Sequence, residues 1–215
     1  MNVKIVDTKQ VRKEVMMKSF NGCEINYKRK GVVLLKKYSI IYADPPWKHT
    51  SWGNGNRRPE LHYPVMDLEE ICNLPIHNMS ADDCTLFLWT TPPHIQESFE
   101  VIKAWGFTYK TFGFTWIKRN KKSEGIFMGC GSWTRANAEV CLLATKGKPK
   151  RMSASVRQVI ISPREEHSKK PDEIRGRIVD LLGELPRVEL FAREKTDGWD
   201  SWGNEIFSDI NLYTD

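Results

Sequence analysis

Short apolar segments alternate with stretches of helical periodicity from Tyr38 onward, and this alternation constrains the fold more than any other feature. Several of the apolar segments are almost continuous, as in strands that are covered on both faces of a sheet. The predicted strands are Tyr38–Ala43, Cys84–Thr91, Tyr109–Ile117, Ala138–Thr145, Arg157–Ser162 and Arg187–Ala192. Strands that alternate with helices predict a three-layer α/β fold with a mostly parallel sheet.

Three stretches between these strands predict helices. A short one begins after Asp67, which can act as its N-cap. A second has an apolar stripe at helical spacing and ends at Gly106, and a third begins near Pro171 and ends at Gly183. The stripe of the second helix is Ile95, Phe99, Ile102 and Trp105, and that of the third is Ile174, Ile178, Leu181 and Leu182.

Composition limits the class of protein. A chain of 215 residues suits one domain with a sizeable core, and no apolar run approaches the roughly 18 residues of a membrane span. The five cysteines form no CxxC pair, and the first residues include no apolar signal segment, so we expect a reducing cytoplasmic location and no metal site. A net charge of +6 permits an anionic partner such as nucleic acid, although a lysine-rich surface alone gives the same charge.

The first predicted strand runs directly into Asp44, Pro45, Pro46 and Trp47. In α/β sheets, ligands bind beyond the carboxyl ends of the strands. A carboxylate there can accept hydrogen bonds from an amino group. Two prolines remove two backbone N–H groups, so we expect their carbonyls to remain as acceptors that point into the site, with no neighbouring N–H group competing for them. Trp47 offers a flat face to a planar ring. These four residues therefore predict a catalytic cradle for the exocyclic amino group of a base, whereas a Pro-Pro turn with a capping aspartate is the structural alternative.

Polar residues near the C-terminus suggest a cofactor site. The last predicted strand leads to Arg193, and Asn204 and Glu205 follow a short polar stretch. Amide, carboxylate and guanidinium groups of this kind suit ribose hydroxyls. Lys170 precedes a predicted helix N-terminus, which suits a carboxylate ligand. Ordinary surface polarity remains the alternative for each residue.

A third polar region precedes the strand Ala138–Thr145. Arg135, Asn137 and Glu139 approach this strand, and a basic run follows it. Such groups suit a base and its phosphates, while a polar loop is the alternative. The basic run is Lys146, Lys148, Lys150 and Arg151.

From about Tyr38 to Ile206, the chain resembles the DPPW-type N6-adenine methyltransferases, the MT-A70 family. Eight blocks in order carry the resemblance: YADPPW, HYPVM, LFLWTTP, WGFTYKTFGFTWIK, SWTRANAEVCLLATKGKP, HSKKPDEI, VELFARE and WGNEI. The resemblance implies a Rossmann-like methyltransferase fold with a permuted motif order and S-adenosylmethionine as the cofactor. It also implies one methyltransferase domain over 1–215, with an N-terminal extension at 1–37 and a catalytic core at 38–206.

The resemblance implies roles for individual residues. Those matched to the catalytic motif are Asp44, Pro45, Pro46 and Trp47, and those matched to cofactor binding are Asp44, Lys170, Phe191, Arg193, Asn204 and Glu205. Tyr63 and Glu139 resemble the family's substrate-side tyrosine and glutamate. The segment between Arg193 and Trp199 is shorter than in the messenger-RNA enzyme of the family.

We therefore expect N6-adenine methylation of DNA, because a chain of this size is more like the bacterial and phage DNA enzymes of the family. The same reaction on RNA and a catalytically silent nucleic-acid-binding homologue are the alternatives. No obligate protein partner is implied. The segment from Lys48 to Met66 follows the catalytic motif, and its Arg57 and Arg58 suit phosphates while Tyr63 suits a base, so we expect it to close over a flipped adenine.

Overall fold

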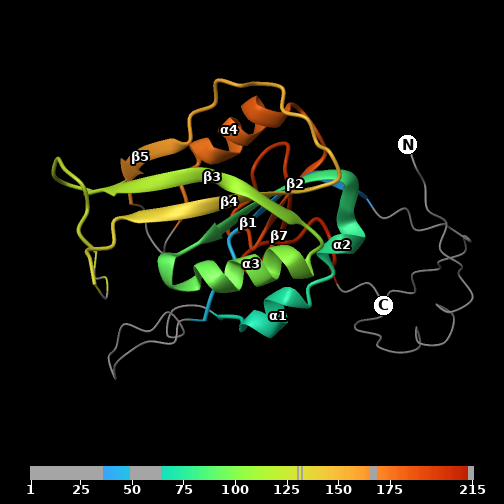
Figure 1. Cartoon of the computed structure of the whole chain (residues 1–215), viewed down its shortest axis with the longest axis horizontal. Coiled ribbons are helices and arrows are strands. Elements are labelled where there is room, and N and C mark those ends of the chain that lie inside the picture. The colour runs from blue at the N-terminus through green and yellow to red at the C-terminus, as the bar shows by residue number, and fades with distance from the viewer. Residues whose placement is uncertain (1–35, 49–63, 130, 132, 165–168, 213–215) are drawn as a thin grey trace, which may run out of the picture.

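A computed structural model describes residues 36–48, 64–129, 131, 133–164 and 169–212, which form one sheet with helices on both faces (Figure 1). The strands lie in the order β5-β3-β4-β2-β1-β6-β7. All six predicted strands are present, with ends that differ by a few residues. The strands are β1 Tyr38–Ala43, β2 Ser80–Thr90, β3 Thr108–Arg119, β4 Ala138–Lys146, β5 Val159–Pro163, β6 Arg187–Leu190 and β7 Asp200–Trp202.

The sheet is mixed, and most of its strand pairs are parallel. β1 pairs in parallel with β2 and β6, β6 with β7, and β3 with β5. Only β4 runs against its neighbours among the described strands, because it pairs antiparallel with both β2 and β3. The carboxyl ends of six strands therefore meet the amino end of β4 at one edge of the sheet.

Helices cover the two faces, as Figure 1 shows, with α1 and α3 on one side and α4 on the other. Ile71, Val101 and Trp105 pack against one face of the sheet, whereas Ile174 and Ile178 pack against the other. This arrangement confirms the three-layer prediction. The helical segments are α1 Leu68–Cys72, α2 Ile76–Met79, the 3-10 turn Pro92–His94, α3 Ile95–Ala104 and α4 Glu173–Leu182.

The helix boundaries follow local chemistry. Asp67 caps α1 as predicted, since its carboxylate accepts a hydrogen bond from Glu70 N at 2.9 Å and the Glu70 side chain accepts one from Asp67 N at 2.8 Å. Gly106 and Gly183 follow α3 and α4 with φ values of 82° and 85°, in the left-handed region that glycine adopts readily.

α4 begins at Glu173, close to Pro171 as predicted. Phe99 belongs to the predicted apolar stripe of α3, but it is 40% exposed and packs edge-on against Tyr109, and Val101 is buried instead. Strand β7 and helix α2 were not predicted.

No helix among the described residues combines the length and the hydropathy needed to cross a bilayer. In the same part of the chain, Cys72, Cys84 and Cys141 are unpaired, and no group of acidic, histidine or cysteine side chains could hold a metal ion.

Candidate active site

One edge of the sheet collects the polar residues of interest, because six carboxyl ends and the amino end of β4 lie there. Asp44 follows β1, Thr91 follows β2, and Phe191 follows β6. Glu139 reaches the same edge at the start of β4. These segments line a cleft, whose lining residues are Asp44, Pro45, Pro46, Trp47, Pro64, Thr91, Glu139, Lys170, Phe191, Ala192, Arg193, Asn204 and Glu205.

In the turn after β1, the carbonyls of Pro45 and Pro46 already accept backbone hydrogen bonds, which was not predicted. Trp47 N donates to Pro45 O at 2.9 Å, and Met66 N donates to Pro46 O at 2.9 Å. The prediction that no N–H group competes for these two carbonyls was therefore wrong. Each carbonyl keeps a second lone pair for a ligand, because an amide oxygen can accept two hydrogen bonds.

Trp47 belongs mainly to the core. Its side chain is 6% exposed, its ring stacks on His94 with 5.6 Å between centroids, and its indole N–H donates to Trp89 O at 3.2 Å. The ring still reaches the cleft wall. Because the side chain is buried, one ring face stacks on His94 and the N–H group is occupied, the structure favours Trp47 as a support for the turn rather than as a free platform.

Lys170 joins two carboxylates from different strands. Its ammonium donates to Asp44 Oδ2 at 2.7 Å and lies 3.3 Å from Glu139 Oε2. Glu139 Oε1 accepts a second bond from Lys118, on β3. The Asp44, Glu139, Lys170 and Lys118 side chains therefore form a continuous chain of charges, which we call the cleft network.

Burial and the neighbouring opposite charges shift the pKa values of the cleft network in opposite directions. Burial raises the pKa of Asp44, and the neighbouring Lys170 only partly offsets the shift. Burial also disfavours the Glu139 carboxylate, but Lys170 and Lys118 outweigh it and hold the pKa of Glu139 below its ordinary value. The two carboxylates raise the pKa of Lys170 despite its burial. Glu139 is consequently the better stabilised anion of the two.

The cleft walls retain buried polar atoms without hydrogen-bond partners. Among the described residues, these include Thr91 Oγ1 and Glu139 Oε2. Since an unsatisfied buried polar atom is costly in free energy, atoms of this kind that line a cleft indicate a ligand site.

The loops after β6 and β7 meet closely at the opposite wall. Phe191 has φ 63°, a strained value for this residue type, and its ring packs edge-on against Trp202. Ala192 N donates to Trp202 O at 2.9 Å, and a Cβ atom on Gly203 would lie 2.0 Å from Ala192 O. Glycine is therefore required at 203, and this contact places the two loops together.

The predicted cofactor residues after these strands converge on the cleft. Arg193 Nε lies 3.7 Å from Glu205 Oε1, and Asn204 is exposed at the rim. Arg193, Asn204 and Glu205 thus lie in the same cleft as Asp44, although they are far from it in sequence.

The predicted substrate residues are only partly described. Asn137 is half-buried and Arg135 is exposed in the segment that leads into β4. Arg57, Arg58 and Tyr63 lie outside the described residues, as does most of the loop from Lys48 to Met66, so their roles stay predictions.

The structure separates the basic run from Glu139. Lys146 ends β4 and donates to Ser80, and Lys148 N donates to Asp83, both at the opposite edge of the sheet. A strand rises about 3.4 Å per residue, so Lys146 lies about 24 Å from Glu139. The grouping of these lysines with Glu139 was therefore wrong.

Sequence reasoning missed Lys118 and Thr91. Both lie within sequence blocks that the resemblance includes, but a lysine at the end of a strand and a threonine before two prolines carry no separate signal. Only the pairing of β3 with β4 brings Lys118 to Glu139.

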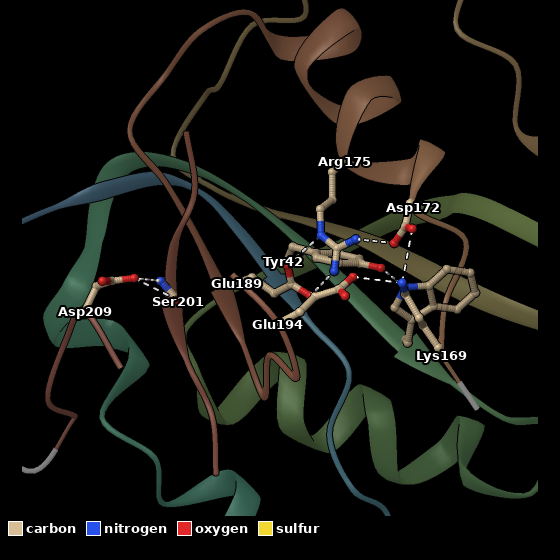
Figure 2. Close-up of polar contacts among 9 residues, drawn as sticks. Tyr42, Lys169, Asp172, Arg175, Glu189, Glu194, Ser201 and Asp209 are labelled. Carbon is tan, nitrogen blue, oxygen red and sulfur yellow. Dashed lines mark hydrogen bonds and ion pairs between the residues drawn. The ribbon is translucent and has the colours of Figure 1, made fainter. Parts of the chain in front are cut away.

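A second ion pair lies behind the cleft, on the side of α4. Figure 2 shows Arg175 extending from α4 towards Glu189 on β6, with Tyr42 beside them. Two parallel hydrogen bonds, of 2.7 and 2.8 Å, join the guanidinium to the carboxylate. The two side chains are 11% and 10% exposed. This bidentate pair fixes α4 to the sheet directly behind the site.

Comparison with known proteins agrees with this architecture. The family model for MT-A70 matches residues 38–205. The Type II methyltransferase M.MunI of Mycoplasma sp is 36% identical over 190 residues, which cover 80% of this chain and 78% of that protein.

Longer relatives match over the same region. The N(6)-adenosine-methyltransferase catalytic subunit METTL3 of Homo sapiens is 31% identical over 188 residues, which cover 86% of this chain and 30% of that protein. The METTL3 subunit of Danio rerio is 31% identical over 190 residues, with the same two shares. The chain therefore spans about 30% of the length of these METTL3 proteins.

Proposed function

Because the chain belongs to the MT-A70 methyltransferase family, we propose that it transfers a methyl group from S-adenosylmethionine to the N6 amino group of adenine in DNA. The observation that carries this proposal is the position of Asp44. Its side chain is 29% exposed at the cleft, and Lys170 holds its carboxylate in place. We further propose that residues 38–206 form a single catalytic domain.

The residues of the cleft fit S-adenosylmethionine. The cleft is lined by carboxylate, guanidinium, amide and ammonium groups, and Thr91 Oγ1 is a buried oxygen there without a hydrogen-bond partner. Arg193, Asn204 and Glu205 would hold the ribose hydroxyls, and Lys170 would exchange its longer contact, with Glu139, for the cofactor's carboxylate. When bound, the cofactor supplies an electrophilic methyl group on a sulfonium.

The chain's own residues would prepare the acceptor nitrogen. The adenine amino group is a weak nucleophile because its lone pair is delocalised into the ring. Asp44 and the second lone pair of the Pro45 carbonyl would accept its two hydrogens, which favours a pyramidal nitrogen and stabilises the positive charge that develops there. The N6 lone pair would form the new N–C bond as the bond from the methyl carbon to sulfur breaks and sulfur keeps that electron pair. One N6 proton would then leave past Asp44 to solvent.

Access to Asp44 requires the base to leave a duplex stack or to come from a single strand. Asp44 lies on the cleft wall and not on a protruding surface, so a stacked adenine cannot reach it. Base extrusion is therefore part of the proposal.

The relatives support DNA over RNA through their coverage. The match with the Type II methyltransferase extends over most of both proteins, whereas the match with METTL3 covers less than a third of it. RNA is the second candidate substrate, because the METTL3 relatives are named N(6)-adenosine-methyltransferases and match 86% of this chain. The joint presence of Asp44 and Lys170 at the cleft argues against a silent homologue.

Methyl transfer from radiolabelled S-adenosylmethionine to DNA and RNA oligonucleotides of the same sequence tests this function. We expect label in DNA, located on adenine N6 by nucleoside analysis, and little label in RNA. Label in RNA alone would overturn the substrate, and cofactor binding without transfer to either polymer would support the silent homologue. Lys148→Ala/Lys150→Ala should transfer label as the wild type does, since both lysines lie at the opposite edge of the sheet from the cleft.

A further inference from the structure

The segment between β3 and β4 projects from the active-site edge of the sheet, where Figure 1 shows it in yellow beyond the ends of both strands. Its two ends carry Lys118 and Glu139, which belong to the cleft network. We call the described residues of this segment, 119–129, 131 and 133–137, the arm. Glu139, beside the base of the arm, forms an ion pair with Lys170, and Lys170 in turn forms one with Asp44.

The arm has a defined backbone fold. Phe127 N donates to Lys118 O at 2.8 Å, and Gly129 N donates to Ala136 O at 2.9 Å, so the chain returns twice towards its own base. Arg164, beyond the end of β5, lies over the Phe127 ring at 4.0 Å from its centroid. Hydrogen bonds and this cation–π contact therefore hold the arm in shape without a ligand.

Two glycines create the turn at the tip of the arm. A Cβ atom on Gly129 would lie 2.3 Å from Ala136 O, and one on Gly131 would lie 1.9 Å from Thr134 O. Any larger residue would push these backbones apart. Gly129 and Gly131 therefore lie directly against the returning backbone at Ala136 and Thr134, and Trp133 is close to them in sequence.

The tip exposes large apolar side chains. Trp133 is 98% exposed and Met128 is 75% exposed, which is unusual for such residues unless they meet a partner. The surrounding charge is strongly positive, because the arm carries one acidic residue, Glu124, and four basic ones. The basic residues are Arg119, Lys121, Lys122 and Arg135.

We propose that the arm is a preformed nucleic-acid clamp, in which Trp133 stacks on a base and Arg119, Lys122 and Arg135 contact phosphates. The inference rests on the proposed function and names the surface that holds its polymer substrate. An aromatic face amid cations is the combination that binds single-stranded or extruded bases. A second copy of this chain fits less well, because two basic arms would repel each other.

The arm has a suitable reach. Trp133 lies six positions before Glu139, which corresponds to at most about 20 Å of extended chain. Successive base pairs are spaced by about 3.4 Å, so Trp133 would contact the polymer within about six steps of the base that lies beside Glu139. Base stacking by Trp133 would therefore hold the strand that feeds the cleft.

Binding to fluorescein-labelled duplex and single-stranded DNA 20-mers, followed by anisotropy, tests the role of Trp133. We expect Trp133→Ala to weaken binding about tenfold, and Trp133→Phe to retain most of the affinity because it keeps an aromatic face. Met152→Ala is the matched control, since Met152 is 76% exposed beside Gly183 at the far end of α4. Equal affinities for Trp133→Ala and the wild type would overturn the stacking role.

The salt dependence of binding tests the phosphate contacts. We expect Arg119→Ala/Lys122→Ala to flatten the slope of log affinity against log salt by about one to two units. Lys148→Ala/Lys150→Ala removes the same charge at the opposite edge and is expected to leave that slope unchanged. Equal slopes for the two double variants would overturn the clamp.

A further control separates this inference from the proposed function. Anisotropy measured on the wild type and the arm variants without S-adenosylmethionine reports the clamp under conditions in which no methyl group can be transferred. Analytical ultracentrifugation measures the oligomeric state and so tests whether a second copy of this chain binds the arm instead. A Trp133→Ala variant that changes the oligomeric state but not the oligonucleotide affinity would assign the arm to protein contact and overturn the clamp.

Discussion

Two networks of buried charge lie a few residues apart at the same sheet edge, and they differ in how fully their atoms are satisfied. Arg175 and Glu189 form a bidentate pair in which both carboxylate oxygens accept a hydrogen bond. In the cleft network, Lys170 is shared between Asp44 and Glu139, and Glu139 Oε2 makes no hydrogen bond.

The difference indicates different uses. A complete pair has little to gain from a ligand, whereas an incomplete network improves when a ligand brings donors or acceptors. We therefore assign the Arg175–Glu189 pair to the stability of the fold and the cleft network to the proposed reaction. Substitutions in the two networks should separate activity from stability.

Asp44→Ala should give the largest effect. We expect methyl transfer to fall by about 10³-fold or more, because the group that accepts the N6 hydrogens is removed. Thermal unfolding should change little, since Lys170 keeps Glu139 as a partner. Asp44→Asn keeps the shape and should be impaired as severely. Normal turnover by either variant would refute the proposed role of Asp44.

Arg175→Met should reverse that pattern. It leaves the Glu189 carboxylate buried without its partner, so we expect the free energy of unfolding to fall by about 3–5 kcal/mol in a denaturant titration. The double variant Arg175→Met/Glu189→Leu should recover most of the loss, because it removes both charges. If the double variant is as unstable as the single one, charge pairing is not what Arg175 contributes.

Lys170→Ala should have an intermediate effect on cofactor binding. A hydrogen bond to a charged group contributes roughly 1.5–3 kcal/mol, so calorimetry should show S-adenosylmethionine binding weakened by about 10- to 100-fold. DNA affinity should be nearly unchanged. Unchanged cofactor affinity would remove Lys170 from the cofactor site.

The pH dependence should show the smallest effect. Asp44 acts as an anion, and burial raises its pKa, so activity should decline as pH falls through a value above the ordinary 3.8. Glu139 has a lowered pKa, and its contribution to stability is present above its ordinary 4.5 and is lost only as pH falls through the lowered value. Activity should therefore decline at a higher pH than the Glu139 contribution to stability, and an acid limb at or below 3.8 would contradict this.

Much of this architecture could be predicted from the sequence because its strands are long and apolar. Strand β7 could not be, since it has three residues and includes the polar Asp200 and Ser201. Its position depends on a partner outside the strand, because the Asp209 carboxylate accepts hydrogen bonds from Ser201 N and Ser201 Oγ at 3.0 and 2.8 Å. Figure 2 shows Asp209 facing Ser201.

Strand direction limited the prediction of the site. Composition does not reveal that β4 runs antiparallel to β2, and that direction alone decides which end of β4 meets the cleft. Glu139 was assigned to the substrate from the sequence, but the lysines after β4 were grouped with it wrongly. The hydrogen bond to the Pro46 carbonyl could not be predicted for a similar reason, since only the tertiary structure brings Met66 N to Pro46 O.

The two adjacent antiparallel strands at the base of the arm also make it a module that can be exchanged. Lys118 N donates to Asn137 O at 2.9 Å, so the arm leaves the sheet and returns at neighbouring positions. An insertion or deletion between these positions leaves the register of β3 and β4 intact. We therefore expect that arms of other lengths and sequences could be grafted at 119–137, which would redirect target choice while the methyl-transfer residues remain where they are.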